Sequence, residues 1–203
     1  MEFRHATLAD LDDVIRVTSE GRAALAAFGL DQWQNGSPTP ERLRADIEAG
    51  YTRVVAATEA DEAIDRQNGL PRIAPGTIIG TVAFCPDGEA DYSCVTQGAW
   101  LCDSPNSPDE ARATGRRIEY VTLHRLATSA QAVRRGVASL MVKRCIDDAL
   151  IRGFRSVRAD THEGNIPMQR TFEKLGMKRC CEIEISNPLE ATKKRVGYEI
   201  VLW

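Results

Sequence analysis

The chain has 203 residues and a formal net charge of −3, with 43% hydrophobic and 27% charged residues. This length fits a single domain, 1–203, and the composition excludes a mostly disordered, collagen-like or long coiled-coil protein. The 26 basic residues are balanced by 29 acidic ones. No broad positive field is therefore available for a phosphate backbone, which argues against a nucleic-acid-binding protein.

The cysteine pattern indicates reduced thiols in a cytoplasmic protein. The six cysteines form no CxxC pair, and only three histidines are present to support them as ligands, so we predict no metal site. Cys180 and Cys181 are adjacent in an expected strand, which would place their side chains on opposite faces. The charged residues 1–5 do not resemble a signal peptide, and no run of about 18 apolar residues predicts a membrane span.

The N-terminal half carries the signals of two helices and several strands. Apolar residues at helical spacing predict a helix from about Leu8 to before Gly29, and a second helix begins at Pro40 after the N-cap Thr39. Strands are expected over residues 2–5, 52–57, 77–85 and 97–101. Two segments, 58–76 and 103–115, are expected to be a loop and an irregular insertion, because both are polar and contain glycine or Ser-Pro.

The C-terminal half alternates strands and helices. The expected elements are a strand over 119–128, a helix over 134–151, a strand over 156–161, a helix over 166–175, and antiparallel strands over 178–186 and 195–203. Such an order predicts an α+β (α/β) fold, in which about four helices flank a central mixed sheet.

The turn before the helix at 134–151 has the composition of an anion-binding site. The first amides of a helix lack internal acceptors and lie at the positive end of its dipole. Gly136 and Ala138 remove side chains that would cover these amides, and Arg134 and Arg135 add positive charge. The alternative is an ordinary glycine-containing turn with two solvated arginines. The GxxxxGK[ST] and GxGxxG nucleotide-binding patterns are absent from this segment.

Three stretches in this half occur in the order of a known family. They are VRRGVA at 133–138, DTHEGN at 160–165 and FEKLGM at 172–177. Together they make residues 120–182 similar to the core of the GNAT N-acetyltransferase superfamily, with its [QR]-x-x-G-x-[GA] turn. Three N-terminal stretches, DQWQNG at 31–36, GAWL at 98–101 and HRLA at 124–127, resemble small bacterial members of that superfamily. The resemblance covers nearly the whole chain except 61–75 and 103–115.

The resemblance implies the GNAT fold and acetyl-CoA as co-substrate, with no metal. In that family the pantetheine arm lies where two central parallel strands splay apart, here the strands over 120–128 and 156–161. The residues that the resemblance assigns to the cofactor are Leu126, Ala127, Thr128, Val133, Arg134, Arg135, Gly136, Val137, Ala138, Ser139, Asn165 and Phe172.

The sequence departs from the family pattern at three of these positions. Val133 replaces a Gln or Arg whose contribution is largely through its backbone, and Ala138 replaces a glycine. Phe172 stands where many members have a tyrosine that protonates the departing thiolate. A phenyl ring donates no proton, so the thiolate would leave unassisted or through water, as a thiol pKa of about 8.5 allows.

The activity implied by the resemblance is direct transfer of an acetyl group to the amine of a small molecule or peptide. His124 and Glu119 are the candidate bases; a structural histidine and a strand cap are their alternative roles. Gln32 and Trp33 are expected at the substrate, with covering of the core as the other role for Trp33. A non-catalytic acyl-CoA-binding or sensing module of the same fold is the second hypothesis, and a homodimer is left open.

Overall fold

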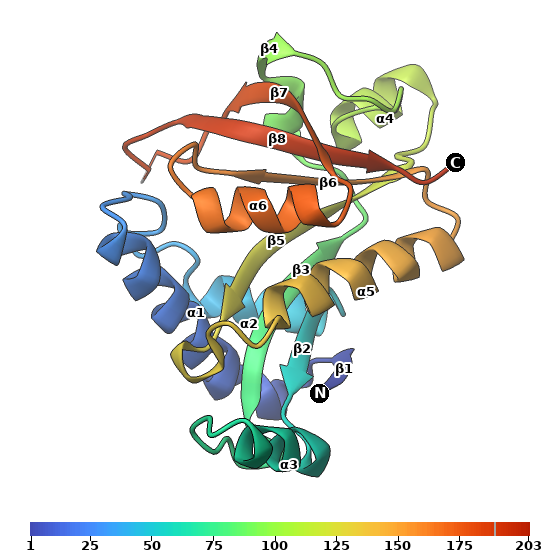
Figure 1. Ribbon diagram of the computed structural model, residues 1–203. Coiled ribbons are helices and arrows are strands. Elements are labelled where there is room, and N and C mark those ends of the chain that lie inside the picture. Colours follow the sequence, from blue (N-terminus) through green and yellow to red (C-terminus); the bar gives the residue numbers. More distant parts are fainter. Residues whose placement is uncertain (189) are drawn as a thin grey trace.

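The computed structural model describes residues 1–188 and 190–203, and its strands form one mixed sheet (Figure 1). The strands are β1 (Glu2–His5), β2 (Thr52–Ala56), β3 (Ile78–Cys85), β4 (Val95–Gly98), β5 (Tyr120–Thr128), β6 (Ser156–Thr161), β7 (Lys178–Glu184) and β8 (Lys194–Val201). Their order in the sheet is β1-β2-β3-β5-β6-β8-β7-β4. The pair β5–β6 is parallel, and the other neighbouring pairs are antiparallel. The expected α+β fold with a mixed sheet is confirmed.

Helices cover both faces of this sheet. They are α1 (Leu11–Ala27), α2 (Pro40–Glu48), α3 (Glu59–Gln67), α4 (Pro108–Thr114), α5 (Val137–Ile151) and α6 (Ile166–Lys174). Val54 of β2 packs with the apolar side chains of α1 and α2, whereas its neighbour Val55 packs in the cluster that contains those of α5. The alternation of side chains along β2 therefore places α1 and α2 on one face and α5 on the other.

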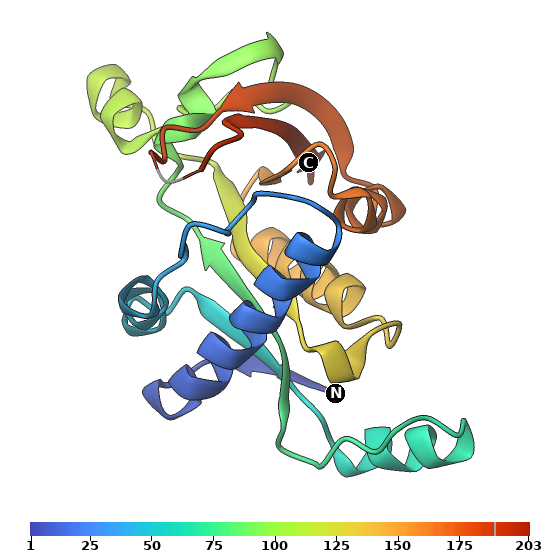
Figure 2. The same ribbon diagram turned by 90° about the vertical axis from the view of Figure 1, so that its left-hand side faces the viewer.

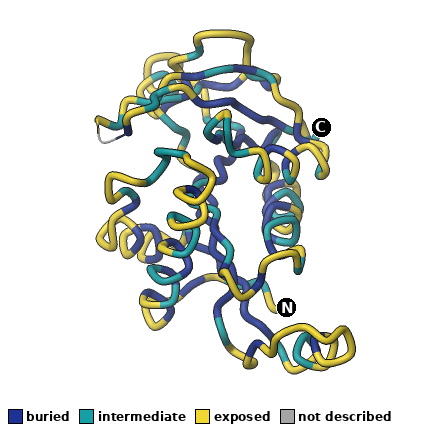
Figure 3. The backbone as a smooth tube through the Cα atoms, turned by 60° about the vertical axis from the view of Figure 1, so that its left-hand side comes forward, coloured by how far each residue is buried: buried dark blue, intermediate teal, exposed yellow. Residues whose placement is uncertain are grey.

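The central strands form the buried part of the molecule. Figure 3 shows a dark core of strands between helices whose outer surfaces are exposed. The larger apolar cluster lies between the sheet and the helices α5 and α6, and includes Met141 and Phe172. Packing of α5 against β3, β5 and β6, and of α6 against β7 and α5, fixes the positions of the loops that precede the two helices.

Two segments expected to be irregular contain helices, so the described residues hold six α-helices rather than about four. In 58–76, Thr58 and Asp61 form a capping box at the start of α3. In 103–115, the Ser107 side chain accepts a hydrogen bond from the amide of Glu110 and caps α4. Both caps are local signals. The glycines, Ser-Pro pairs and high polarity of these segments nevertheless favour irregular structure, so the two helices are not predicted.

Three further expectations need correction. The helix expected from Arg134 begins at Val137, because Arg134 and Gly136 adopt left-handed backbone with φ of 65° and 76°. The strand expected over 97–101 is β4, over Val95–Gly98. Cys180 and Cys181 do not point to opposite faces: a β-bulge follows Arg179, and the two Sγ atoms lie 3.9 Å apart.

A buried ion pair anchors the segment between β4 and β5. Arg158 of β6 and Glu199 of β8 are fully buried, with 2.9 Å between Nε and Oε1. The other guanidinium nitrogens of Arg158 donate to Asn106 Oδ1 and to the Cys102 carbonyl, both at 2.7 Å. Its guanidinium also lies over the Tyr120 ring, 4.0 Å from the centroid. The long connection is thereby held by charge-assisted bonds rather than by apolar packing alone.

The substitution Glu199→Gln is expected to destabilise the fold strongly. It leaves the Arg158 guanidinium buried without its counter-charge, which costs about 3–5 kcal/mol. Urea unfolding followed by circular dichroism measures the loss. Glu182→Gln, which removes the partner of the solvent-exposed Lys194, is the matched control and should change stability little. Equal effects of the two substitutions would contradict the assigned role of the buried pair.

Candidate active site

The parallel pair β5–β6 separates halfway along β5. Pairing runs from Tyr120 opposite Ser156 to Leu123 opposite Ala159. On the other edge of β5, a β-bulge sets two residues, Arg125 and Leu126, against the single residue between Thr81 and Ala83 of β3. Bulges bend a strand and increase its twist. The last residues of β5 thus diverge from β6, and their edge toward β6 has no strand paired to it in the described part of the chain.

The bulge is held by a buried carboxylate on α2. Arg125 has left-handed backbone with φ of 52°, a conformation that costs of order 1 kcal/mol or more for a non-glycine residue. Its Nε lies 2.6 Å from Oδ2 of Asp46, whose side chain is 3% exposed. Arg42 reaches the other oxygen of Asp46 at 3.1 Å. The two ion pairs hold Arg125 in its strained conformation and so keep β5 bent.

A cavity of about 660 Å³ lies at this separation. It is bounded by β5, β6, α1, α6, the start of α5, and the loops that follow α1 and β7. The predicted site residues that line it are Gln32, Trp33, His124, Leu126, Ala127, Thr128, Val133, Ala138, Asn165 and Phe172. The structure therefore brings most of the predicted site residues together in one space.

The start of α5 is open. Leu140 makes the first helical hydrogen bond, from its amide to the Gly136 carbonyl at 2.9 Å. Within residues 1–188 and 190–203, the amides of Val137, Ala138 and Ser139 have no hydrogen-bond acceptor, and no side chain caps the helix. Gly136, at φ 76°, provides the turn without a Cβ that would cover them. These three amides and the helix dipole form an anion site beside the cavity.

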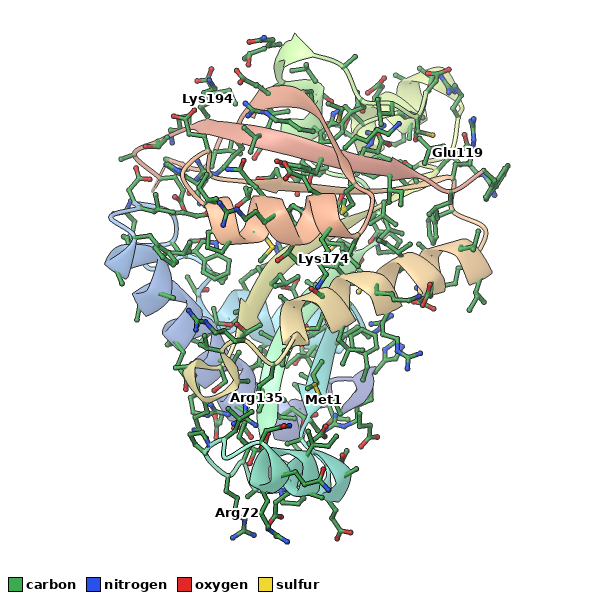
Figure 4. The ribbon with its side chains drawn as sticks, viewed as in Figure 1. Met1, Arg72, Glu119, Arg135, Lys174 and Lys194 are labelled. Carbon is green, nitrogen blue, oxygen red and sulfur yellow. The ribbon has the colours of Figure 1, made fainter. Side chains whose placement is uncertain are left out.

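The two arginines before this turn have different surroundings. Arg135 forms an ion pair with Asp65 of α3 and donates to the Pro71 carbonyl at 2.6 Å, with a side chain only 9% exposed. In Figure 4 it lies between the start of α5 and α3. The Arg135 side chain is therefore held by an ion pair within the protein, and its contact with a phosphate stays a prediction. Arg134 is exposed beside the open helix start.

His124 is paired with a carboxylate that the sequence did not indicate. Its Nε2 lies 2.9 Å from Oε2 of Glu89, in the loop after β3, and both side chains line the cavity. Burial opposes ionisation of Glu89, but the hydrogen bond and charge of His124 outweigh it and lower the pKa of this carboxyl group. A histidine oriented by a carboxylate in a cavity wall is suited to general-base chemistry.

Glu119, the second candidate base, lies elsewhere. It precedes β5 and pairs with Arg155 at 3.1 Å, and it is not among the residues that line the cavity. Figure 4 shows it on the side of the molecule opposite α1. Because Glu119 does not reach the space that His124 faces, it is not placed to accept a proton there.

Asp160 of β6 is a further cavity residue that sequence reasoning missed. Its Oδ1 accepts a hydrogen bond from the Tyr92 hydroxyl at 3.0 Å. Burial raises the pKa of Asp160, an effect that the charge of His124 only partly offsets. The Tyr92 ring lies 6.2 Å from the His124 ring, centroid to centroid. Asp160, Tyr92, His124 and Glu89 thus form one polar cluster where β5 and β6 part.

Asn165 and Phe172 line the cavity from α6. The side chain of Asn165 caps this helix and donates to Thr161 Oγ1 at 3.0 Å, so it has the predicted turn role and also faces the cavity. Phe172 packs against Tyr198, with 5.4 Å between ring centroids. The Tyr198 hydroxyl donates to Glu173 at 3.0 Å, and burial raises its pKa to about 12.

Two loops that line the cavity are bonded to each other. The amide of Trp33, in the loop after α1, donates to Glu190 Oε1 at 2.9 Å, and the amide of Thr192 donates to Asp31 Oδ2 at 2.7 Å. We call these four residues the loop clasp. Arg195 holds Glu190 through a buried ion pair of 3.1 Å. Figure 2 shows the loop after α1 reaching the end of the molecule where α6, β7 and β8 lie.

The divided strand pair, the open helix start and the cavity between them are the parts of an acetyltransferase of the GNAT type. The model of the acetyltransferase (GNAT) family matches residues 32–177, and the chain belongs to this family. The resemblance seen in the sequence is thereby confirmed. In the part of the chain that the structure describes, no group of three or more His, Cys, Asp or Glu residues could hold a metal, and no helix is suited to crossing a membrane.

Solved structures agree with this assignment. A GNAT family acetyltransferase from Streptococcus agalactiae 2603 is 27% identical with a TM-score of 0.73, covering 100% of this chain and 95% of its own. A GNAT family acetyltransferase from Listeria monocytogenes shares the fold at 14% identity and a TM-score of 0.63, with coverages of 99% and 94%. The ribosomal-protein-S18-alanine N-acetyltransferase of Escherichia coli does so at 10% and 0.59, with coverages of 98% and 92%. No curated protein matches the sequence.

The ion pair of Glu89 with His124 predicts a pH-dependent contribution to stability. A carboxyl group whose pKa is lower in the folded than in the unfolded state stabilises the fold above its unfolded pKa, here about 4.5. The contribution is lost as the pH falls through the folded pKa. The difference in unfolding free energy between wild type and Glu89→Gln should therefore be largest above about pH 5 and shrink below 4.5. Urea titrations at several pH values measure it, and a difference independent of pH would contradict the pairing.

Proposed function

We propose that this protein is an N-acetyltransferase that transfers the acetyl group of acetyl-CoA directly to an amine. The observation that carries the proposal is the continuity of one cavity, which passes from the open start of α5 to the His124–Glu89 pair. An anionic cofactor at one end and a proton-accepting pair at the other are the two requirements of this reaction.

The residues present fit acetyl-CoA. The bare amides of Val137, Ala138 and Ser139 suit a pyrophosphate, and Arg134 adds a nearby charge. The unpaired edge of β5 at Leu126–Thr128 offers backbone groups to an extended pantetheine arm, as a neighbouring strand would. Val133, Asn165 and Phe172 bound the same path.

His124 is the proposed general base. When its Nε2–H donates to Glu89, Nδ1 is the basic nitrogen of the ring, and it takes the proton that the amine loses on attack. The new C–N bond forms, the C–S bond of the thioester breaks, and the electron pair leaves with the sulfur. A backbone amide at the β5 bulge near Leu126 would stabilise the oxyanion between these steps. Gln32 and Trp33 bound the amine end of the cavity.

Phe172 supports a second candidate function. Its ring cannot protonate the thiolate, which is compatible with a module that binds acyl-CoA without turning it over. A thiol pKa of about 8.5 allows a thiolate to leave without an acid, so we favour the enzyme. We also propose that the protein uses acetyl-CoA, acetylates a nitrogen and works in the cytoplasm.

The substitution His124→Ala tests the enzyme. It should lower kcat for thiol release from acetyl-CoA by about 10²–10⁴-fold, the range of general-base catalysis, while calorimetry finds the affinity for coenzyme A nearly unchanged. His5→Ala, in β1 and outside the cavity, is the control and should retain activity. Tight coenzyme A binding without thiol release for any amine would favour the sensing module, and no binding would remove both candidates.

Single substitutions of the two arginines should affect different properties, coenzyme A affinity for one and stability for the other. Arg134→Ala is expected to weaken coenzyme A binding by about tenfold, since a charge-assisted contact is lost. Arg135→Ala should change this affinity little but lower the melting temperature, because Asp65 loses its partner. Calorimetry and thermal unfolding of both variants compare them directly. A greater loss of affinity for Arg135→Ala than for Arg134→Ala would instead indicate that the Arg135 side chain binds the phosphates.

A further inference from the structure

The cations in the cavity wall are already neutralised. Arg42 and Arg125 both form ion pairs with Asp46, at 3.1 Å and 2.6 Å. Arg195 bonds to Glu190 at 3.1 Å in a pair that is almost fully buried. The charges of Arg125 and Arg195 still act on Glu89 and Asp160, but neither arginine forms an ion pair with them.

Three carboxylates of the wall remain without such a cation. They are Glu89, Asp91 and Asp160, and within residues 1–188 and 190–203 no lysine or arginine nitrogen lies within 4 Å of any of them. Glu89 has only His124, and Asp91 accepts a hydrogen bond from the amide of Ser186 at 3.0 Å. The amine end of the cavity is therefore acidic, whereas the end at α5 attracts anions.

The surroundings of Asp160 indicate that its partner comes from outside the protein. The carboxyl group is held in place by the Tyr92 hydroxyl, and burial raises its pKa, because the fold supplies too little positive charge to compensate for lost solvation. An ionised carboxylate in these surroundings lowers the stability of the fold, and a bound cation would restore the lost stability.

Gln32 provides an independent indication that the bound molecule carries a hydrogen-bond donor. Its Oε1 is buried and has no donor among the described residues, and the side chain lines the same cavity. The loop clasp joins the two loops here, so the amine enters a space with preformed walls. A small molecule with several N–H groups suits these observations better than an extended chain.

We propose that the acceptor is a small aliphatic amine that carries a second cationic group, an ammonium or guanidinium, and that Asp160 with Glu89 and Asp91 selects it. The inference rests on the proposed acetyl transfer and names its acceptor class. The three carboxylates leave a place for a second positive charge besides the nitrogen that His124 deprotonates.

The test compares three probes of equal chain length: 1,4-diaminobutane, butylamine and 4-aminobutanoate. Thiol release should give a kcat/KM for the diamine at least tenfold above that for butylamine, with 4-aminobutanoate lowest. Added salt should reduce the diamine's advantage. Asp160→Asn should remove most of it, whereas Asp147→Asn, on the exposed side of α5, should keep it. Equal rates for the first two probes, or a preference for 4-aminobutanoate, would overturn the inference while leaving the acetyltransferase intact.

A second readout does not depend on turnover. An aspartate whose pKa is higher in the folded state destabilises the fold when the pH exceeds its unfolded pKa, so Asp160→Asn should raise the melting temperature at pH 7. With coenzyme A present, 1,4-diaminobutane should raise the melting temperature of wild type more than that of Asp160→Asn. If Asp160→Asn does not fold, Asp91→Asn takes its place, because an amide keeps the bond from Ser186.

The two proposals fail in distinguishable ways. If no amine is acetylated, the proposed function fails, and calorimetry with 1,4-diaminobutane then decides the inference alone. Binding that Asp160→Asn abolishes would support the cation site. An absence of binding by the wild-type protein with coenzyme A would overturn it.

Discussion

The site depends on the bent end of β5, where Asp46 holds Arg125 in a left-handed conformation. A regular β5 would continue its pairing with β6 beyond Leu123 and leave no space between the strands. The bulge instead turns the strand away, and the cavity occupies the gap. One carboxylate on α2 thus determines whether the proposed cofactor and amine have a place to meet, although α2 itself contributes little to the wall.

The charge of the cavity wall changes sign from one end of the cavity to the other. At the start of α5, three bare amides and the helix dipole favour an anion. Where β5 and β6 part, the three carboxylates Glu89, Asp91 and Asp160 favour a cation. Each end complements the charge of the molecule proposed to bind there, so the arrangement orients both reactants before their reacting atoms come close.

Features that neighbouring residues encode, such as helices and strands, could be predicted from the sequence. Side-chain partners that are distant along the chain could not. The strands and helices after residue 119 follow from periodicity and glycine stops, and most boundaries lie within a few residues of the expected ones. His124 was predicted from its strand, but its partner Glu89 lies 35 residues away in a loop that no local pattern marks. Arg135 was assigned to phosphate from its place before the helix start, and its partner Asp65, 70 residues away, is not indicated by any local pattern. Glu119 is close to the site along the chain, yet it lies just before the far end of β5.

The loop clasp has a consequence for how selectivity arises. Asp31, Trp33, Glu190 and Thr192 already join the two loops, and the buried Arg195 fixes Glu190 from behind. Ordering loops around a ligand normally costs conformational entropy, which lowers the affinity. Here that ordering belongs to folding, so the proposed discrimination among amines rests on fit to a preformed shape and on charge, rather than on an enclosing movement after the encounter.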